Sequence, residues 1–281
     1  MSGSTTGKGL SFHKKDLHTS NAMKYNRVLT IAGSDSGGGA GIQADIKAIS
    51  ALGCFATSAI TAITVQNTLG VEAVHPVPLD ILEGQIDAVL ADIGTDAVKI
   101  GMLHSAQVVE VVRRALDRHN APNVVLDPVM VSTSGHRLIE ESAIETLRTT
   151  LIPRARVITP NIPEAEILAG TKITHNSQLP EVARALSRGG KVSVLLKAGH
   201  LTEDRLVDIF YNAEDDTLTE LPSQRIYTPN THGTGCTLSS ALAAMLASGH
   251  DLTTAARLPP NPEYEKNILV YKNSCNDGMK N

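Results

Sequence analysis

The sequence contains no tryptophan, and aromatic residues make up only 3% of its 281 residues. A core of the size that this length allows must therefore be built from Ala, Val, Ile and Leu, which suits a parallel sheet covered by helices. Hydrophobic residues reach 42% and charged residues 19%, a composition that does not fit global disorder. The length favours one large domain over two small ones.

Cysteine is also scarce, with Cys54, Cys236 and Cys275 far apart in the chain. Such spacing indicates neither a disulfide framework nor a cysteine zinc site and is typical of a reducing compartment. No run approaches the ~18 apolar residues of a membrane span, and the first residues do not form a signal peptide. The net charge of −4 without a long basic run argues against nucleic acid or membrane partners. We expect a cytoplasmic protein that acts on a small molecule.

The two ends of the chain differ from its middle. Residues 1–26 are polar and lack periodicity, which predicts a disordered leader or a cloning remnant outside the fold. The folded domain is expected over 27–257. Residues 258–281 form an atypical polar tail, because the prolines of Leu258-Pro259-Pro260-Asn261-Pro262 prevent a helix there.

Between these ends, short apolar runs alternate with segments of helical length. The apolar runs predict buried strands at 28–32, 56–65, 97–100, 124–126, 157–159 and 192–196. The apolar spacing predicts helices at 41–52, 79–90, 105–119, 142–151, 179–187 and 234–248. A β-hairpin is expected from 206–211 and 218–226 around the polar turn 212–216. This alternation predicts an α/β fold: a doubly wound, mostly parallel sheet with helices on both faces and right-handed crossovers.

Chemically distinctive residues follow nearly every predicted strand. In chain order these are the glycine loop 33–41, Gln66-Asn67, Gly101-Met102, Asp127-Pro128, Pro160-Asn161 and the segment 197–200. In an open parallel sheet, ligands bind beyond the carboxyl ends of the strands. We therefore expect a ligand crevice at this edge.

Two glycine motifs allow more than one interpretation. The segment 39–44 matches a loose dinucleotide-binding pattern, but Gln66-Asn67 stand where that pattern needs an acidic residue, so we disfavour it. The second motif, T-H-G-T-G-C at 231–236, leads directly into the helix predicted at 234–248. Backbone N–H groups at a helix N-terminus form an anion site. A simple turn followed by a buried cysteine is the structural alternative. His136, His200 and His232 are interpreted as local hydrogen-bonding residues.

The segment G-T-G-C-T-L-S at 233–239 resembles the anion-hole motif of the ribokinase-like kinases. Its cysteine, where most members have aspartate, resembles the hydroxymethylpyrimidine/phosphomethylpyrimidine kinases of thiamine biosynthesis. Further motifs are similar to that family, in order, from about Arg27 to Arg257: G-G-A-G-I-Q-A-D (38–45), Q-N-T (66–68), K-I-G-M-L (99–103), D-P-V-M (127–130), T-P-N-I-P-E-A (159–165) and K-A-G-H (197–200). The resemblance implies a ribokinase-like fold and ATP-dependent phosphorylation of 4-amino-5-hydroxymethyl-2-methylpyrimidine and then of its monophosphate. It also implies magnesium and a homodimer.

The same resemblance implies roles for individual residues. The transferring phosphoryl group would accept hydrogen bonds from the N–H groups of Gly233, Thr234 and Gly235. Cys236 would act as the base. The helix N-terminus would lower its pKa from ~8.5 into the ~3.5–7.5 range. ATP phosphates would be bound by Asn161, Lys197 and Thr231. Magnesium would be held by Glu164, by Asn161 through water, and by Asp127, with a capping box of Asn161 and Glu164 as the structural alternative. The substrate would be bound by Gly33, Ala40, Asp45, Gln66, Met102 and Val129.

Two other functions remain open. A pyridoxine- or pyridoxal-type vitamin kinase shares the scaffold and sometimes the cysteine. The family normally continues beyond the position of Arg257 with another helix, which the tail 258–281 does not resemble. The second alternative is therefore an inactive, truncated form that binds the pyrimidine without transferring phosphate.

Overall fold

The structure, a computed structural model, describes residues 25–67, 69–131, 138–199, 205–224 and 232–257. The predicted leader up to residue 24 and the predicted tail 258–281 lie outside these ranges, as do Thr231, His136 and His200. Among the described helices, none is long and apolar enough to cross a bilayer.

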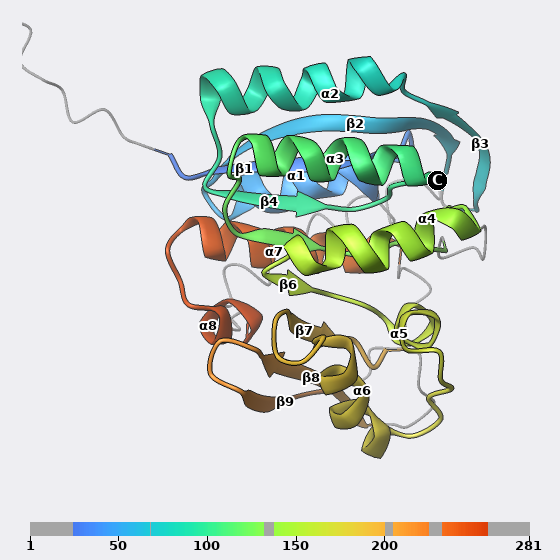
Figure 1. The fold of residues 1–281 in the computed structure, drawn as a ribbon, viewed down its shortest axis with the longest axis vertical. Helices are drawn as coiled ribbons and strands as arrows, with labels where there is room; N and C mark the ends of the chain where they lie inside the picture. The colour runs from blue at the N-terminus through green and yellow to red at the C-terminus, as the bar shows by residue number, and fades with distance from the viewer. Residues whose placement is uncertain (1–24, 68, 132–137, 200–204, 225–231, 258–281) are drawn as a thin grey trace, which may run out of the picture.

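One nine-stranded sheet forms the centre of the molecule, in the order β3-β2-β1-β4-β5-β6-β7-β8-β9 (Figure 1). The six inner strands are parallel: β1 (Arg27–Ser34), β2 (Phe55–Gln66), β4 (Ala97–Ile100), β5 (Val124–Leu126), β6 (Val157–Ile158) and β7 (Ser193–Leu196). Antiparallel strands flank them on both sides: β3 (Val71–Pro76), β8 (Arg205–Asn212) and β9 (Thr217–Gln224). The mostly parallel sheet agrees with the predicted fold class.

Helices cover both faces of the sheet, because parallel strands need apolar cover on each side. One face packs against α2 (Leu79–Ala88), α3 (Ala106–Arg118), α4 (Glu141–Thr146), α5 (Ile162–Ala169) and α6 (Leu179–Leu186) (Figure 1). The other packs against α1 (Gly41–Ala51), α7 (Thr234–Ala247) and α8 (Leu252–Arg257). Short π segments lie at Val89–Ile93 and Leu147–Leu151, and 3-10 turns at Ile152–Arg154 and Asn176–Gln178.

The side chains of β1 show how the two cores are divided. Leu29 and Ile31 belong to the core under α2 and α3, whereas Val28 belongs to the core under α1 and α7. Successive strand residues point to opposite faces, so a continuous apolar run fills both cores at once. This is why the buried strands were recognisable as short apolar runs.

The strands predicted at 97–100 and 124–126 coincide with β4 and β5, and the predicted hairpin is confirmed as β8 and β9. The elements β3 and α8 were not predicted, and of α5 only the start was, as the alternative capping box of Asn161 and Glu164. β3 pairs with β2 at the sheet edge and is mostly exposed, so it lacks an apolar run.

Candidate active site

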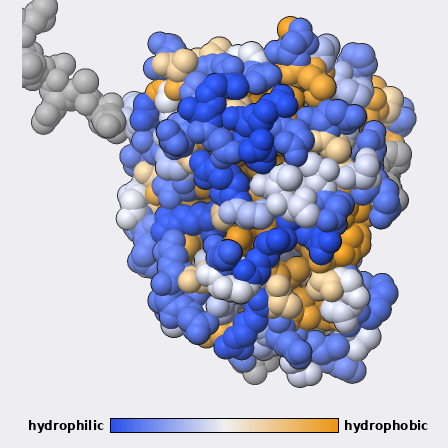
Figure 2. Space-filling model, in the orientation of Figure 1, coloured by the Kyte–Doolittle hydropathy of each residue, from blue (hydrophilic) through white to orange (hydrophobic). Residues whose placement is uncertain are grey.

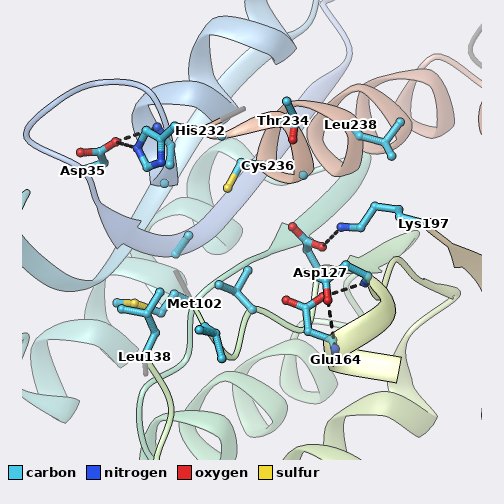
Figure 3. A pocket seen from close by; sticks show the side chains of 18 of the residues that line it. Asp35, Met102, Asp127, Leu138, Glu164, Lys197, His232, Thr234, Cys236 and Leu238 are labelled. Carbon is cyan, nitrogen blue, oxygen red and sulfur yellow. Dashed lines mark hydrogen bonds and ion pairs between the residues drawn. The ribbon is translucent and has the colours of Figure 1, made fainter. Parts of the chain in front are cut away.

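A cavity of about 510 Å³ opens at the carboxyl ends of the parallel strands (Figure 3). Its walls include residues that follow β1, β2, β4, β5, β6 and β7, together with the N-terminal turn of α7. The edge is the one at which a parallel sheet is expected to bind a ligand. Most of the residues predicted for the site line it: Gly33, Ala40, Gln66, Met102, Asp127, Val129, Asn161, Glu164, Lys197, Gly233, Thr234, Gly235 and Cys236.

The glycine loop beside the cavity is folded around the carboxylate of Asp35, which is 1% exposed. This carboxylate accepts hydrogen bonds from the backbone N–H groups of Gly37 at 2.8 Å, Gly39 at 3.1 Å and Ala40 at 2.7 Å. Burial by itself would raise the pKa of Asp35, but these bonds and the bond from His232 outweigh burial and lower it. The loop is therefore ordered around a buried negative charge.

His232 joins this loop to the motif at the start of α7. Its Nε2 lies 2.9 Å from Oδ2 of Asp35 and 3.4 Å from the side-chain nitrogen of Gln66 (Figure 3). Gly233 has a φ of +77°, and a Cβ on it would lie 1.7 Å from the carbonyl oxygen of Gly39. The two glycine motifs thus touch each other, and the contact leaves no room for a side chain at Gly233. Sequence reasoning missed the His232–Asp35 pair, since the two residues lie 197 positions apart.

The first turn of α7 points into the cavity. The first N–H groups of a helix have no partner within the helix, and Thr234, Gly235 and Cys236 line the cavity at this end. A Cβ on Gly235 would lie 3.1 Å from Nζ of Lys197, so a lysine ammonium adjoins the helix N-terminus. This arrangement attracts an anion twice, through the helix dipole and through the lysine.

Cys236 lies in the middle of the cavity in Figure 3, between the Asp35–His232 pair and the Asp127–Lys197 pair. Burial raises the pKa of its thiol to about 11, although the charge of Lys99 acts in the opposite direction. The prediction that the helix N-terminus lowers this pKa is therefore wrong for this structure. Desolvation, to which the charges of Asp45 and Asp127 add, disfavours the thiolate by more than Lys99 and a backbone hydrogen bond from Gly41 favour it.

Asp127 and Lys197 form an ion pair at the ends of β5 and β7. Oδ1 of Asp127 accepts a hydrogen bond from Nζ of Lys197 at 2.9 Å and another from the hydroxyl of Thr159 at 2.8 Å. Burial by itself would raise the pKa of Asp127, but Lys197 and Lys99 lower it; burial would lower the pKa of Lys197, but Asp127 raises it. Lys197 thus carries an ammonium group paired with Asp127 at the cavity wall, and is not an ordinary surface lysine.

Asn161 and Glu164 begin α5 with a capping box. The side chain of Asn161 accepts a hydrogen bond from the backbone N–H of Glu164 at 2.9 Å. The side chain of Glu164 in turn accepts one from the backbone N–H of Asn161 at 2.9 Å. The structural alternative is confirmed, and Glu164 still lines the cavity. Burial raises the pKa of Glu164 to about 7, with Lys197 opposing this shift and Asp127 adding to it.

The carboxyl groups of Asp127 and Glu164 are compatible with magnesium. A cation beside Glu164 would offset the burial that holds its pKa near 7. Among the described residues, no three His, Cys, Asp or Glu side chains cluster as a metal cage. Magnesium does not need one, because it keeps several waters and binds through one or two carboxylates and substrate phosphates.

Of the predicted substrate residues, the structure places Asp45 away from the cavity wall. Asp45 is fully buried, and its carboxylate contacts Nζ of Lys99 at 2.8 and 2.9 Å. Gly33 and Met102 lie in direct contact, since a Cβ on Gly33 would be 2.6 Å from the Met102 methyl group. The cavity wall near these residues also includes the amide of Gln66, the hydroxyl of Thr64 and the apolar side chain of Val129.

A sequence model of the phosphomethylpyrimidine kinase family matches residues 35–259. The chain belongs to the phosphomethylpyrimidine kinase family. A hydroxymethylpyrimidine/phosphomethylpyrimidine kinase from Bacillus subtilis is 44% identical over 240 residues, or 85% of this chain and 88% of the relative. A thiamine biosynthesis bifunctional protein from Geobacter sulfurreducens is 46% identical over 242 residues, and the match spans 49% of that longer protein.

Solved structures of this family and of related vitamin kinases share the fold. A phosphomethylpyrimidine kinase from Clostridium difficile 630 has a TM-score of 0.73 at 43% identity, covering 83% of this chain and 95% of that one. The pyridoxal kinase of Staphylococcus aureus, in complex with AMP-PCP and pyridoxal, has a TM-score of 0.76 at 32% identity, covering 84% and 85%. The predicted family and the ribokinase-like fold are confirmed.

Proposed function

We propose that this chain transfers the γ-phosphoryl group of ATP to the hydroxymethyl group of 4-amino-5-hydroxymethyl-2-methylpyrimidine and then phosphorylates the monophosphate. One observation carries the proposal. The same cavity holds Cys236 between two groups of residues: apolar side chains with the amide of Gln66 and the Asp35–His232 pair on one side, and the charged side chains of Asp127, Glu164 and Lys197 on the other. The first side suits a small heterocycle, and the second suits phosphate with magnesium.

The substrate side has the chemistry of an aminopyrimidine site. The amide of Gln66 both donates and accepts hydrogen bonds, as the edge of an aminopyrimidine requires. Met102, Val129 and Ala40 offer apolar contact to the faces of the ring. A side chain at Gly33 would meet the end of the Met102 side chain, which would have to move.

Phosphoryl transfer depends mainly on positioning and on stabilising charge. The N–H groups of Gly233, Thr234 and Gly235 would bind the transferring phosphoryl group, and Lys197 would add a positive charge. Lys197 and Asn161 lie side by side through a parallel backbone bridge, so both can contact the phosphates of ATP. Cys236 would accept the proton of the substrate hydroxyl. The proposed phosphate contact of Thr231 lies outside the described residues.

Magnesium would be held by Glu164 and Asp127, with Asn161 contributing through water. The bound ion would neutralise phosphate charge. In its presence Glu164 would be ionised, which also supports the capping bond that it accepts from the N–H of Asn161.

We further propose that the protein is a cytoplasmic homodimer. The described cysteines, Cys54 and Cys236, are free thiols, as expected in a reducing compartment. Three large apolar side chains are exposed at one end of β2 and in the following turn: Ile63 at 53%, Val65 at 55% and Leu69 at 87%. A second copy of the chain covering this surface would remove them from water.

The test is to incubate the purified chain with magnesium-ATP and the hydroxymethylpyrimidine, with pyridoxine and pyridoxal in parallel, and to identify the products by mass. Mono- and diphosphates of the pyrimidine are expected. Faster turnover of pyridoxal would favour the vitamin kinase alternative, which the likeness to a pyridoxal kinase of known structure supports. Binding of the pyrimidine without any phosphorylated product would favour the inactive form.

A further inference from the structure

A lysine–aspartate pair lies fully buried between β4, α1 and α7. Nζ of Lys99 contacts both carboxylate oxygens of Asp45, at 2.8 and 2.9 Å, and both side chains are 0% exposed. The hydroxyl groups of Thr30 and Ser240 donate to the same carboxylate at 2.6 and 2.8 Å. A buried ion pair is often no more stabilising than apolar residues of the same volume. Stability alone therefore does not account for these two charges in the core.

The position of the pair points to the active site. Lys99 is among the residues that line the cavity, and a Cβ on Gly101, just after β4, would lie 2.9 Å from its Nζ. Cys236 and Ser240 are four residues apart on α7, hence on the same helix face. Because Ser240 donates to Asp45, the ion pair lies against the face of α7 that carries Cys236.

The electrostatic environment of Cys236 supports the same connection. Among the described charged groups that act on its sulfur, Lys99 and Lys197 favour a negative charge, whereas Asp45 and Asp127 oppose it. After burial, Lys99 has the largest effect on Cys236. Lys197 is paired with Asp127, which leaves Lys99 as the cation held against α7 by Asp45.

We propose that Lys99 is a positioning residue for Cys236: its ammonium group, fixed by Asp45, stabilises the thiolate that accepts the proton of the substrate hydroxyl. The inference rests on the proposed role of Cys236 as base. In that step the O–H bond of the substrate breaks and an S–H bond forms. The substrate oxygen bonds to the γ-phosphorus of ATP, and the bond from that phosphorus to ADP breaks. Asp45 acts through Lys99 and does not touch the substrate.

The test measures the thiol of Cys236 directly, without any substrate. The intact protein is alkylated with iodoacetamide across a pH series, and modification of the Cys236 peptide is followed by mass spectrometry. The variant Lys99→Met/Asp45→Asn removes both charges and avoids leaving one of them unpaired in the core. Its alkylation midpoint should move to higher pH, with roughly tenfold slower modification at a fixed pH below the midpoint. Its kcat for the pyrimidine should fall while the KM for ATP changes little.

A second variant gives the opposite sign. Asp45→Asn alone keeps the ammonium of Lys99 and removes the negative charge that opposes the thiolate, so the midpoint should move to lower pH. Because Asp45→Asn leaves Lys99 unpaired in the core, its melting temperature is measured first; where this variant is folded, it carries the test if the double variant is not. The matched control is Arg27→Met, which breaks the Arg27–Asp96 pair at the opposite ends of β1 and β4. The control should leave the midpoint unchanged even if it lowers the melting temperature.

The outcomes separate the inference from the proposed function. Unchanged midpoints in folded Lys99→Met/Asp45→Asn and Asp45→Asn would overturn the role of Lys99, whatever the wild-type protein phosphorylates. Shifts of opposite sign would support it. A wild-type protein that shows no pyrimidine phosphorylation would instead overturn the proposed function, and the alkylation data would still report whether Lys99 controls the thiol.

Discussion

At the scale of the residue, the proposed role of Cys236 as base predicts how the reaction should depend on pH. Its thiol has a pKa raised to about 11 by burial, so only a small fraction is thiolate at neutral pH. Below the pKa this fraction grows tenfold with each pH unit. We therefore expect kcat/KM for the pyrimidine to rise steadily with pH through the neutral range, since kcat/KM reports the ionisation of the free enzyme. A flat profile would contradict a thiolate base.

Removing the thiol gives the complementary prediction. Cys236→Ala should lower kcat by ~10²–10⁴-fold, the usual contribution of a positioned base. The matched control is Cys54→Ala, because Cys54 is also buried but contacts the carbonyl oxygen of Ala244 and the hydroxyl of Ser248, far along α7. Steady-state kinetics should show near-normal kcat in the control. Full turnover in Cys236→Ala would remove this residue from the mechanism.

The buried carboxyl group of Glu164 predicts how stability depends on pH. Burial raises its pKa from 4.5 to about 7, so between these values the folded protein binds more protons at this site than the unfolded chain. The stabilisation from Glu164 is complete below pH 4.5 and is lost as the pH rises through 7. Glu164→Gln keeps an acceptor for the Asn161 N–H and should become more stable than wild type at high pH, by up to about 3 kcal/mol.

Urea unfolding at pH 5 and pH 8 without magnesium measures this difference. The stability advantage of Glu164→Gln should grow from the lower to the higher pH. Magnesium with ATP should then stabilise the wild type more than the variant, because only the wild type offers a carboxylate to the ion. An equal difference at both pH values would show that Glu164 does not titrate in this range.

At the scale of the element, the start of α7 depends on Gly233. This residue has a φ of +77°, and a side chain there would meet the carbonyl oxygen of Gly39 at 1.7 Å. Gly233→Ala must therefore push apart the two glycine motifs that border the proposed phosphate site. We expect a large loss of kcat and a higher KM for ATP.

Gly249 provides a matched control at the other end of α7. It has a φ of +86°, but no atom lies within 4 Å of an added Cβ. Gly249→Ala should cost about 1–2 kcal/mol from the left-handed conformation alone and leave kcat unchanged. Thermal unfolding and steady-state kinetics on both variants separate backbone strain from the contact with Gly39. Normal turnover in Gly233→Ala would show that this contact is not needed for catalysis.

At the scale of the whole molecule, the exposed surface around Ile63, Val65 and Leu69 predicts association. The face shown in Figure 2 is largely hydrophilic over α2, α3 and α4, with hydrophobic patches toward the end where β3 lies. Light scattering should give twice the chain mass of 29.8 kDa. Ile63→Asp/Val65→Asp should give the single-chain mass, whereas Leu79→Asp, also exposed but on α2, should not. A monomeric wild type would contradict the homodimer.

The sequence alone determined the inner parallel strands, most of the helices that cover them and the edge at which the cavity opens. Buried parallel strands need continuous apolar runs, and glycines or polar groups must follow them where the chain turns at the site. For this reason Asp127, Asn161, Lys197 and Cys236 could be found by their place after a strand or before a helix. The edge strand β3 could not be found in this way, because a mostly solvent-exposed strand needs no apolar run.

Only the tertiary structure decided which charges meet and how strongly each is buried. Asp45 forms an ion pair with Lys99 and does not line the cavity wall, and His232 contacts the carboxylate of Asp35. Both pairs join residues that are far apart in the sequence. The pKa of Cys236 also depended on packing: the helix N-terminus visible in the sequence favours a thiolate, but the walls supplied by other elements remove water and reverse the shift. Local sequence specifies the backbone and its dipoles, whereas desolvation and ion pairing depend on neighbours that only the folded chain brings together.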